Sequence, residues 1–224
     1  MSDKHGLLQP EQLEELRALS SSVVSDALEA LGLSGFQEAL GPLVPGTKLV
    51  GPAVTVRYLP VGISGGTVGD YMDVPQTGDV LVLDNGGRLD CTVWGGILSE
   101  VASAMGLAGT VIHGVCRDVE VTRALDYPMF TRGTYMVTGK DRVAMAGVNE
   151  PVSIGRTRVE PGDLVFGDDM GVVIVPRVKL GEVLAVARQI QVKEEAIVTE
   201  VRKGTTLREA RGRHGYHGLQ RSKT

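Results

Sequence analysis

Residues 94–118 read WGGILSEVASAMGLAGTVIHGVCRD, and they predict a helix, a buried strand and a charged turn in succession. Apolar residues recur at helical spacing over 97–106, which places five of them on one face: Ile97, Leu98, Val101, Ala102 and Met105. The apolar run over 109–113 is typical of a strand covered on both faces. This order returns Arg117 to the end of the sheet at which Gly96 opens the helix.

The rest of the chain predicts an α/β domain with helices at both ends. Residues 10–31 favour two helices, the second capped by Ser21 or Ser22 and ended by a glycine, and the Pro- and Gly-rich segment 33–47 favours a loop. Strands are predicted over 50–59, over 80–83, and as short strands within 133–175. A long helix follows over 178–202, with the apolar stripe Val183, Val186, Ile190, Ile197 and Val201.

The predicted domain organisation is one domain over residues 1–204 followed by a short tail. A length of 224 residues suits one domain or a tight pair. Residues 205–224 are basic, rich in glycine and poor in apolar residues, so we expect a flexible C-terminal tail.

Composition and charge exclude several classes of protein. A net charge of −4 argues against a nucleic-acid binder that works through a general basic field. No stretch approaches the roughly 20 apolar residues of a transmembrane helix, and residues 1–20 lack the apolar centre of a signal peptide. Cys91 and Cys116 lack the spacing of metal ligands, which favours buried free thiols and a cytoplasmic location.

The glycine-opened helix predicts a site for a small anion. Backbone N–H groups from Gly95 to Leu98 have no intrahelical partner, and the positive end of the helix dipole favours a carboxylate there. Arg117 offers a planar, two-pronged donor for the same carboxylate, and Asp118 offers a hard oxygen ligand for Mg²⁺ or Mn²⁺. An Arg-Asp pair at a helix start is, taken alone, more often a cap or a surface ion pair. The spacing to the glycines favours the anion site.

Several motifs together resemble the RraA-like proteins. They are Trp94-Gly95-Gly96-Ile97-Leu98, then 109–118, then Tyr127-Pro128-Met129-Phe130, with support from 24–28, 51–56, 161–163 and 169–173. This superfamily holds the regulator of ribonuclease E activity and the 4-hydroxy-4-methyl-2-oxoglutarate/4-carboxy-4-hydroxy-2-oxoadipate aldolases. The resemblance implies a compact layered α/β/β/α-type domain with N-terminal helices, mixed β-sheets and a long C-terminal helix. It also implies a homotrimer or a dimer of trimers, with active sites between neighbouring subunits.

The resemblance also implies roles for the site residues. The backbone of Gly95, Gly96, Ile97 and Leu98 and the side chain of Arg117 would hold a 2-oxo acid such as pyruvate. Asp118 would bind the divalent cation, partly through water, and a neighbouring subunit would contribute Glu194 or Glu195. The known aldolases carry an Asp twenty-one residues before this Arg, where Gly96 stands here. This departure weakens the case for aldol cleavage more than the case for binding a 2-oxo acid.

The expected activity is therefore that of a lyase dependent on Mg²⁺ or Mn²⁺ that acts on short 2-oxo acids. Retro-aldol cleavage or oxaloacetate decarboxylation would give pyruvate through a metal-stabilised enolate. A Schiff-base route is disfavoured because the seven lysines all lie in polar or terminal contexts. The alternative is a non-catalytic regulator that binds a ribonuclease or another protein partner. The long C-terminal helix favours the enzyme.

Overall fold

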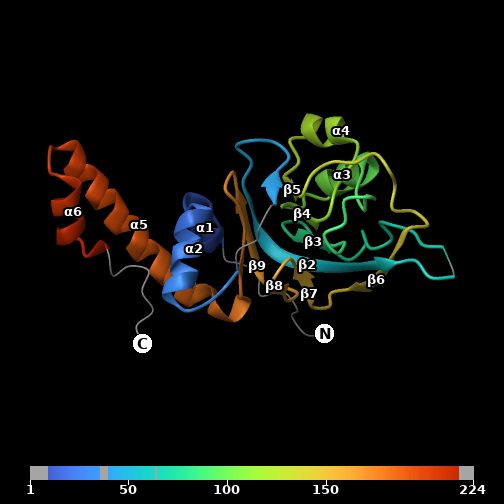
Figure 1. The fold of residues 1–224 in the computed structure, drawn as a ribbon, viewed down its shortest axis with the longest axis horizontal. Helices are drawn as coiled ribbons and strands as arrows, with labels where there is room; N and C mark the ends of the chain where they lie inside the picture. Colours follow the sequence, from blue (N-terminus) through green and yellow to red (C-terminus); the bar gives the residue numbers. More distant parts are fainter. Residues whose placement is uncertain (1–9, 36–39, 64, 217–224) are drawn as a thin grey trace.

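The computed structural model describes residues 10–35, 40–63 and 65–216, and its centre is a mixed sheet (Figure 1). Within these residues the strand order is β1-β5-β4-β3-β2-β9-β10, with β6 also paired to β2. The strands are β1 (Gly41–Pro42), β2 (Leu49–Pro60), β3 (Val80–Asp84), β4 (Gly109–His113), β5 (Met129–Thr131), β6 (Val143–Val148), β9 (Leu164–Asp168) and β10 (Gly171–Val175). A separate hairpin consists of β7 (Val152–Ile154) and β8 (Thr157–Val159).

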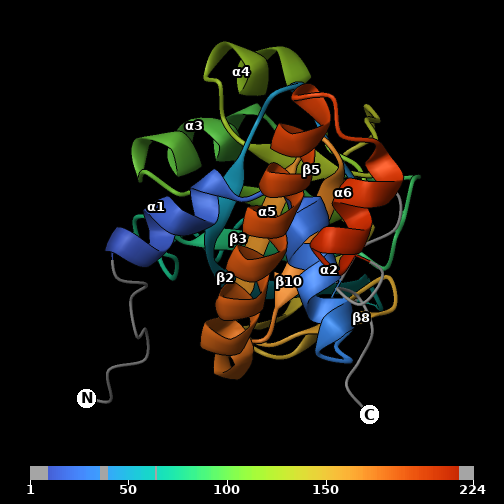
Figure 2. The same ribbon diagram turned by 90° about the vertical axis from the view of Figure 1, so that its left-hand side faces the viewer.

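Helices cover the sheet at its two ends. They are α1 (Pro10–Ala18), α2 (Ser21–Ala30), α3 (Gly96–Ala104), α4 (Val119–Ala124), the 3₁₀ helix η1 (Arg177–Lys179), α5 (Leu180–Arg202) and α6 (Leu207–Arg213). Figure 2 shows α5 lying beside α2, and Figure 1 shows α3 and α4 at the other end of the molecule. The predicted α/β fold, with mixed strands, N-terminal helices and a long C-terminal helix, is confirmed.

The parallel part of the sheet positions the candidate site. Parallel pairing joins β2 to β3, β3 to β4 and β4 to β5. The helix α3 connects β3 to β4, and α4 connects β4 to β5. Asp84 and His113 are register partners, so β3 and β4 end at the same edge of the sheet. Ligands of open α/β sheets bind at this carboxyl edge, and both residue 95 and residue 117 follow it in the chain.

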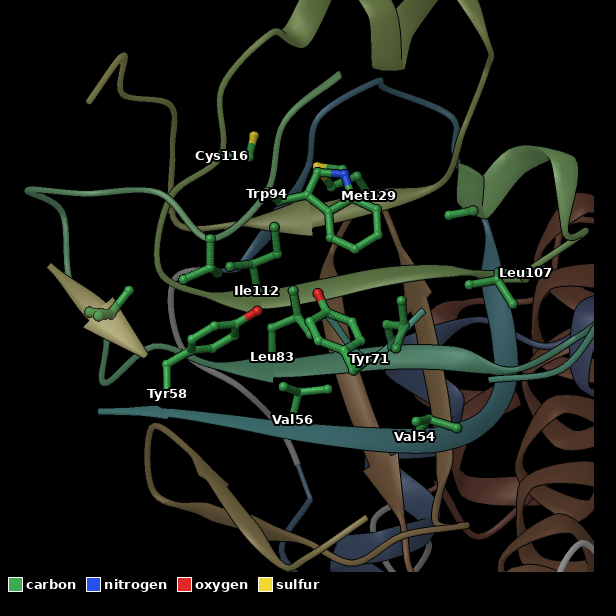
Figure 3. Packing of buried hydrophobic residues seen from close by; sticks show 14 of the residues in the cluster. Val54, Val56, Tyr58, Tyr71, Leu83, Trp94, Leu107, Ile112, Cys116 and Met129 are labelled. Carbon is green, nitrogen blue, oxygen red and sulfur yellow. The ribbon is translucent and has the colours of Figure 1, made fainter. Parts of the chain in front are cut away.

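Two apolar cores hold the helices on the sheet. Beneath α3 and α4, a cluster is formed by side chains of the parallel strands together with Tyr58, Tyr71 and Trp94 (Figure 3). The second cluster joins α1, α2 and α5 to β9 and β10, and its α5 residues are Val183, Leu184, Ala187 and Ile190. The stripe residues Val183 and Ile190 are therefore used within the chain, and Ile197 is buried as well, whereas Val201 is 39% exposed.

Near the N-terminus, two local predictions were wrong. Ser20, not Ser21 or Ser22, caps α2, because its hydroxyl accepts a hydrogen bond from Val23 N at 3.3 Å. The hydroxyl of Ser21 donates instead to Asp168, at the end of a distant strand, at 2.6 Å. The predicted loop 33–47 also contains β1, which pairs with β5.

The predicted apolar face of α3 is wrong in part. Ile97 is 83% exposed and Val101 is 37% exposed, whereas Gly96, Ser99 and Ala102 are buried. The small residues lie on the buried side. They let α3 approach its neighbours closely, so burial follows residue size here rather than hydrophobicity.

The tail predicted to be flexible contains the helix α6, Leu207–Arg213, and its flexibility stays a prediction. Thr206 and Glu209 form a capping box, and Ala210 is fully buried. Glu200 of α5 pairs with Arg213 and with His214. Polar caps and ion pairs build this helix without an apolar stripe. Residues 217–224 lie outside the described part of the chain, and the division at residue 204 stays a prediction.

Across the described ranges, no helix is both long enough and apolar enough to cross a membrane.

Candidate functional site

A pocket of about 190 Å³ opens at the N-terminus of α3. Its lining comes from the loop before α3, the first turn of α3, the turn before α4 and the two further loops that contain Val68 and Thr138. The lining residues are Val68, Thr92, Trp94, Gly95, Gly96, Ile97, Leu98, Arg117, Asp118 and Thr138. The structure thus brings together the six residues that the sequence predicts for substrate and cation. Their roles in binding stay predictions.

The two glycines allow the Arg117–Asp118 turn to approach α3 closely. A Cβ atom added at Gly95 would lie 2.7 Å from Asp118 Oδ2 and 3.1 Å from Arg117 Nε. A Cβ atom at Gly96 would lie 3.2 Å from Val121 Cγ2, so it would face α4. A side chain at residue 95 would therefore displace the charged groups of the pocket.

The start of α3 retains two N–H groups that suit an anion. Gly96 N donates to Asp118 Oδ2 at 2.9 Å, and Ser99 N donates to Gly95 O at 3.1 Å. Ile97 and Leu98 lie between them in the first turn, where N–H groups have no intrahelical acceptor. Of the N–H groups predicted for the anion site, that of Gly96 is thus bonded to Asp118, and those of Ile97 and Leu98 suit an anion.

Asp118 has an unusual conformation that aims its carboxylate at α3. It is the N-cap of α4, with φ 54° and ψ 45°, and its side chain does not cap its own helix. This left-handed conformation is uncommon outside glycine and often marks functional sites. Its Oδ2 atom contacts Gly96 N, and no hydrogen bond among residues 10–35, 40–63 and 65–216 uses Oδ1. The side chain is 48% exposed, so Oδ1 is available to a ligand.

Arg117 is held by its backbone and leaves most of its guanidinium free. Its N–H donates to Trp94 O at 3.1 Å, and its Nε lies 3.6 Å from Asp118 Oδ2. Within the described ranges, its terminal nitrogens make no hydrogen bond or ion pair, and the side chain is 41% exposed. Of the two simpler interpretations, the surface ion pair is present, whereas the Asp118 side chain does not cap α4. The ion pair uses only one carboxylate oxygen and one edge of the guanidinium.

Sequence reasoning missed the pocket residues Val68, Thr92 and Thr138. Thr92 N donates a hydrogen bond to Val137 O at 2.9 Å, and this bond joins two loops that are far apart in the chain. No spacing in the sequence marks such a contact. A second hollow of about 340 Å³ shares Arg117 and Asp118, and Val119, Glu120, Thr134, Tyr135 and Met136 complete its lining.

A divalent cation would find one carboxylate in this pocket, that of Asp118. The described residues contain no group of three or more His, Cys, Asp or Glu side chains that could hold a metal ion. Mg²⁺ commonly keeps several waters and binds through one or two carboxylates together with its substrate. The half-exposed Asp118 therefore fits a partly hydrated cation, but not one enclosed by protein ligands.

Glu194 and Glu195 lie on α5, at the opposite end of the molecule from α3 and α4 (Figure 1). Burial raises the pKa of Glu194, and the charge of Asp26 on α2 raises it further. Neither glutamate joins Arg117 within one chain. A role for either of them in the pocket requires a neighbouring subunit.

Comparisons with known proteins agree with this fold and identify the family of the chain. The family model described as RraA-like (Aldolase/RraA) matches residues 21–174, and the chain therefore belongs to the RraA-like family. The resemblance stated from the motifs is thereby confirmed. The matched region contains the whole pocket.

Two relatives illustrate the range of this family. Protein DlpA of Legionella pneumophila is 40% identical over 210 residues, which cover 92% of this chain and 34% of that protein. This chain thus spans about a third of the length of that relative. A protein of Halalkalibacterium halodurans named "Putative 4-hydroxy-4-methyl-2-oxoglutarate aldolase" is 34% identical, over 82% of this chain and 85% of its own length.

Solved structures share the fold. An uncharacterized protein from Pseudomonas syringae pv. tomato has a TM-score of 0.85 and 38% identity, covering 92% of this chain and all of its own. RraAS2 of Streptomyces coelicolor, titled an unusual member of the RNase ES inhibitor RraA family, has a TM-score of 0.75 and 29% identity. The match covers 84% of this chain and 96% of that one.

Proposed function

We propose that this protein is a divalent-metal-dependent lyase that releases pyruvate from short 2-oxo acids. One observation carries the proposal: the free edge of Arg117, the N–H groups of the first turn of α3 and the unused Oδ1 of Asp118 line a single pocket. A 2-oxo acid presents a carboxylate beside a carbonyl oxygen. An anion site next to a hard cation ligand matches that pair of groups.

The residues of this chain would bind and orient the substrate. Arg117 would hold the substrate carboxylate through its terminal nitrogens, with the N–H groups of Ile97 and Leu98 as further donors. Asp118 Oδ1 would hold Mg²⁺ or Mn²⁺, which when bound supplies Lewis-acid polarisation of the C2 carbonyl during cleavage of the C3–C4 bond. Trp94 and Val68 line the same pocket and would provide its apolar side.

The names of relatives support the aldol reaction. Gly96 stands where the known aldolases carry an Asp, so oxaloacetate decarboxylation remains a second candidate reaction. Aldol cleavage requires removal of a proton from the C4 hydroxyl, a task suited to a positioned carboxylate. Decarboxylation requires no such base. The second candidate function is a non-catalytic regulator, which is supported by the likeness to RraAS2.

A coupled assay tests the proposal. The purified protein is mixed with Mg²⁺ and either oxaloacetate or 4-hydroxy-4-methyl-2-oxoglutarate, and pyruvate is measured with lactate dehydrogenase. We expect release that a chelator abolishes and that exceeds the release with an Arg117→Ala variant at the same Mg²⁺ concentration. Equal release by the two proteins, from both substrates, would reject the lyase. Inhibition of a ribonuclease by the same preparation would then favour the regulator.

We also propose that a homotrimer, or a dimer of trimers, completes the site with Glu194 or Glu195 of a neighbouring subunit. Removing α5 cannot test this, because Val183 and Ile190 are part of the core. We expect one of the variants Glu194→Gln and Glu195→Gln to lose about tenfold or more in kcat. Glu182→Gln, on the same helix, should be nearly neutral.

Subunit mixing shows whether that glutamate acts across an interface. The inactive glutamate variant and Arg117→Ala are denatured and refolded together, so that some interfaces combine an intact arginine with an intact glutamate. We expect recovery of activity in the mixture. Activity no greater than the sum of the two separate variants would place the complete site within one chain.

Gly96 stands where the known aldolases carry an Asp, and substituting it should change the ratio of aldol cleavage to decarboxylation. We expect Gly96→Asp to raise the ratio of aldol cleavage to oxaloacetate decarboxylation, because it adds a carboxylate beside the pocket. Gly96→Ala is the control for the added Cβ, which would contact Val121. Both ratios are measured on the same preparations. An unchanged ratio in a folded, active Gly96→Asp protein would reject this role for residue 96.

A further inference from the structure

A chain of buried hydrogen bonds lies directly behind the pocket. Trp94 Nε1 donates to Ser99 Oγ at 2.9 Å, and Ser99 Oγ lies 2.8 Å from Thr122 Oγ1. Trp94 is 1% exposed, and Ser99 and Thr122 are completely buried. Trp94 also belongs to the core of Figure 3. These hydrogen bonds join the loop before α3, the first turn of α3 and the first turn of α4.

In these buried hydrogen bonds, one placement of the hydroxyl protons lets every donor find an acceptor. Ser99 Oγ donates to Gly95 O at 3.3 Å and accepts from Trp94 Nε1. The proton between the two hydroxyls then comes from Thr122, so Ser99 accepts twice and donates once. A serine hydroxyl has one donor and two acceptor positions, and all three are filled.

The same two helices meet a second time inside the pocket. There, Gly96 N donates to Asp118 Oδ2, and Arg117 N donates to Trp94 O. Ser99 lies one turn beyond the start of α3, and Thr122 lies one turn beyond Asp118. The buried hydroxyl pair thus sits one turn behind the groups that would hold the carboxylate and the cation.

We propose that Ser99 and Thr122 are positioning residues that set the distance between the first turn of α3 and the Arg117–Asp118 turn. The proposal rests on the function proposed above, because this distance is the one between the anion donors and the cation ligand. Errors of about 1 Å in such a distance cost about 10²-fold in rate. An exposed ion pair such as Arg117–Asp118 would not hold that distance by itself.

Thr122→Val removes the link while keeping the shape of the side chain. Ser99 retains its donor, Trp94, and its acceptor, Gly95 O, so no other buried polar atom loses its partner. We expect kcat/KM to fall about tenfold or more, and Thr122→Ser, which keeps the hydroxyl, to remain within about threefold of the parent.

The matched control is Thr110→Val. Thr110 is fully buried, and its hydroxyl lies 2.8 Å from the hydroxyl of Tyr127, but it does not line either hollow. Tyr127 also stacks on Trp94 and donates its N–H to Thr122 O. This variant therefore removes a neighbouring buried hydroxyl pair while leaving the Ser99–Thr122 link in place. We expect its kcat/KM to stay within about twofold of the parent even where its melting temperature falls as far as that of Thr122→Val.

Amide hydrogen exchange provides a readout that does not depend on turnover. We expect the Gly96 amide to exchange about tenfold faster or more in Thr122→Val, and at the parental rate in Thr110→Val, because only the former frees α3 from α4. Unchanged Gly96 exchange in folded Thr122→Val would overturn the positioning role, as would an equal loss of kcat/KM in Thr110→Val. A parent protein that releases no pyruvate would overturn the lyase instead, and the exchange comparison would still decide whether the link holds the two turns together.

Discussion

Arg117→Lys should lower kcat/KM for pyruvate release about 100-fold or more while leaving the melting temperature close to that of the parent. The loss corresponds to about 2.7 kcal/mol of transition-state stabilisation. Lysine keeps the positive charge but presents a single ammonium in place of a planar fork that matches a carboxylate. The fold should tolerate the change because the side chain is 41% exposed and because its structural tie to Trp94 is made by the backbone.

Arg123→Lys is the matched control, since Arg123 lies on α4 and outside both hollows. Its kinetics should match those of the parent. Steady-state kinetics with oxaloacetate and with 4-hydroxy-4-methyl-2-oxoglutarate would measure both variants. Retention of near-parental kcat/KM by Arg117→Lys would mean that the substrate carboxylate binds elsewhere.

Asp118→Asn should raise the Mg²⁺ concentration needed for half-maximal activity by about 10–100-fold, because a neutral amide oxygen is a poor ligand for a hard cation. Asparagine tolerates the left-handed backbone found here, and its amide oxygen still offers an acceptor to Gly96 N. The effect should therefore appear in the cation requirement rather than in stability.

Asp126→Asn controls for the backbone conformation in that experiment. Asp126 also has a positive φ, 48°, and it lies after α4, outside both hollows. Mg²⁺ titrations of initial rate would compare the two variants with the parent. A parental Mg²⁺ requirement in Asp118→Asn would remove this residue from the cation site.

The unit over 94–118 was predictable because its signals are local. Glycines open and close α3, and a β-branched apolar run forms β4, so the return of Arg117 to the glycine-opened end follows from lengths alone. The long strand β2 and the long helix α5 carried equally local patterns. The fold class followed from the alternation of such elements.

The missed features depend on contacts between distant segments. Thr92 and Thr138 meet in the pocket through loops that are far apart in sequence. The buried side of α3 depends on the close approach of its neighbours, which the spacing of its own apolar residues does not report. No local pattern therefore distinguishes Ser99, although it is fully buried and bonded to Trp94 and Thr122.

A crystal structure of the protein with Mn²⁺ and oxalate, a stable mimic of the pyruvate enolate, would show whether one pocket binds both a 2-oxo acid and a divalent cation. The anomalous signal of manganese locates the cation. We expect a manganese peak within coordination distance of Asp118 and an oxalate carboxylate within hydrogen-bond distance of the Arg117 guanidinium. Manganese and oxalate bound together at another place, with this pocket holding only water, would contradict this expectation.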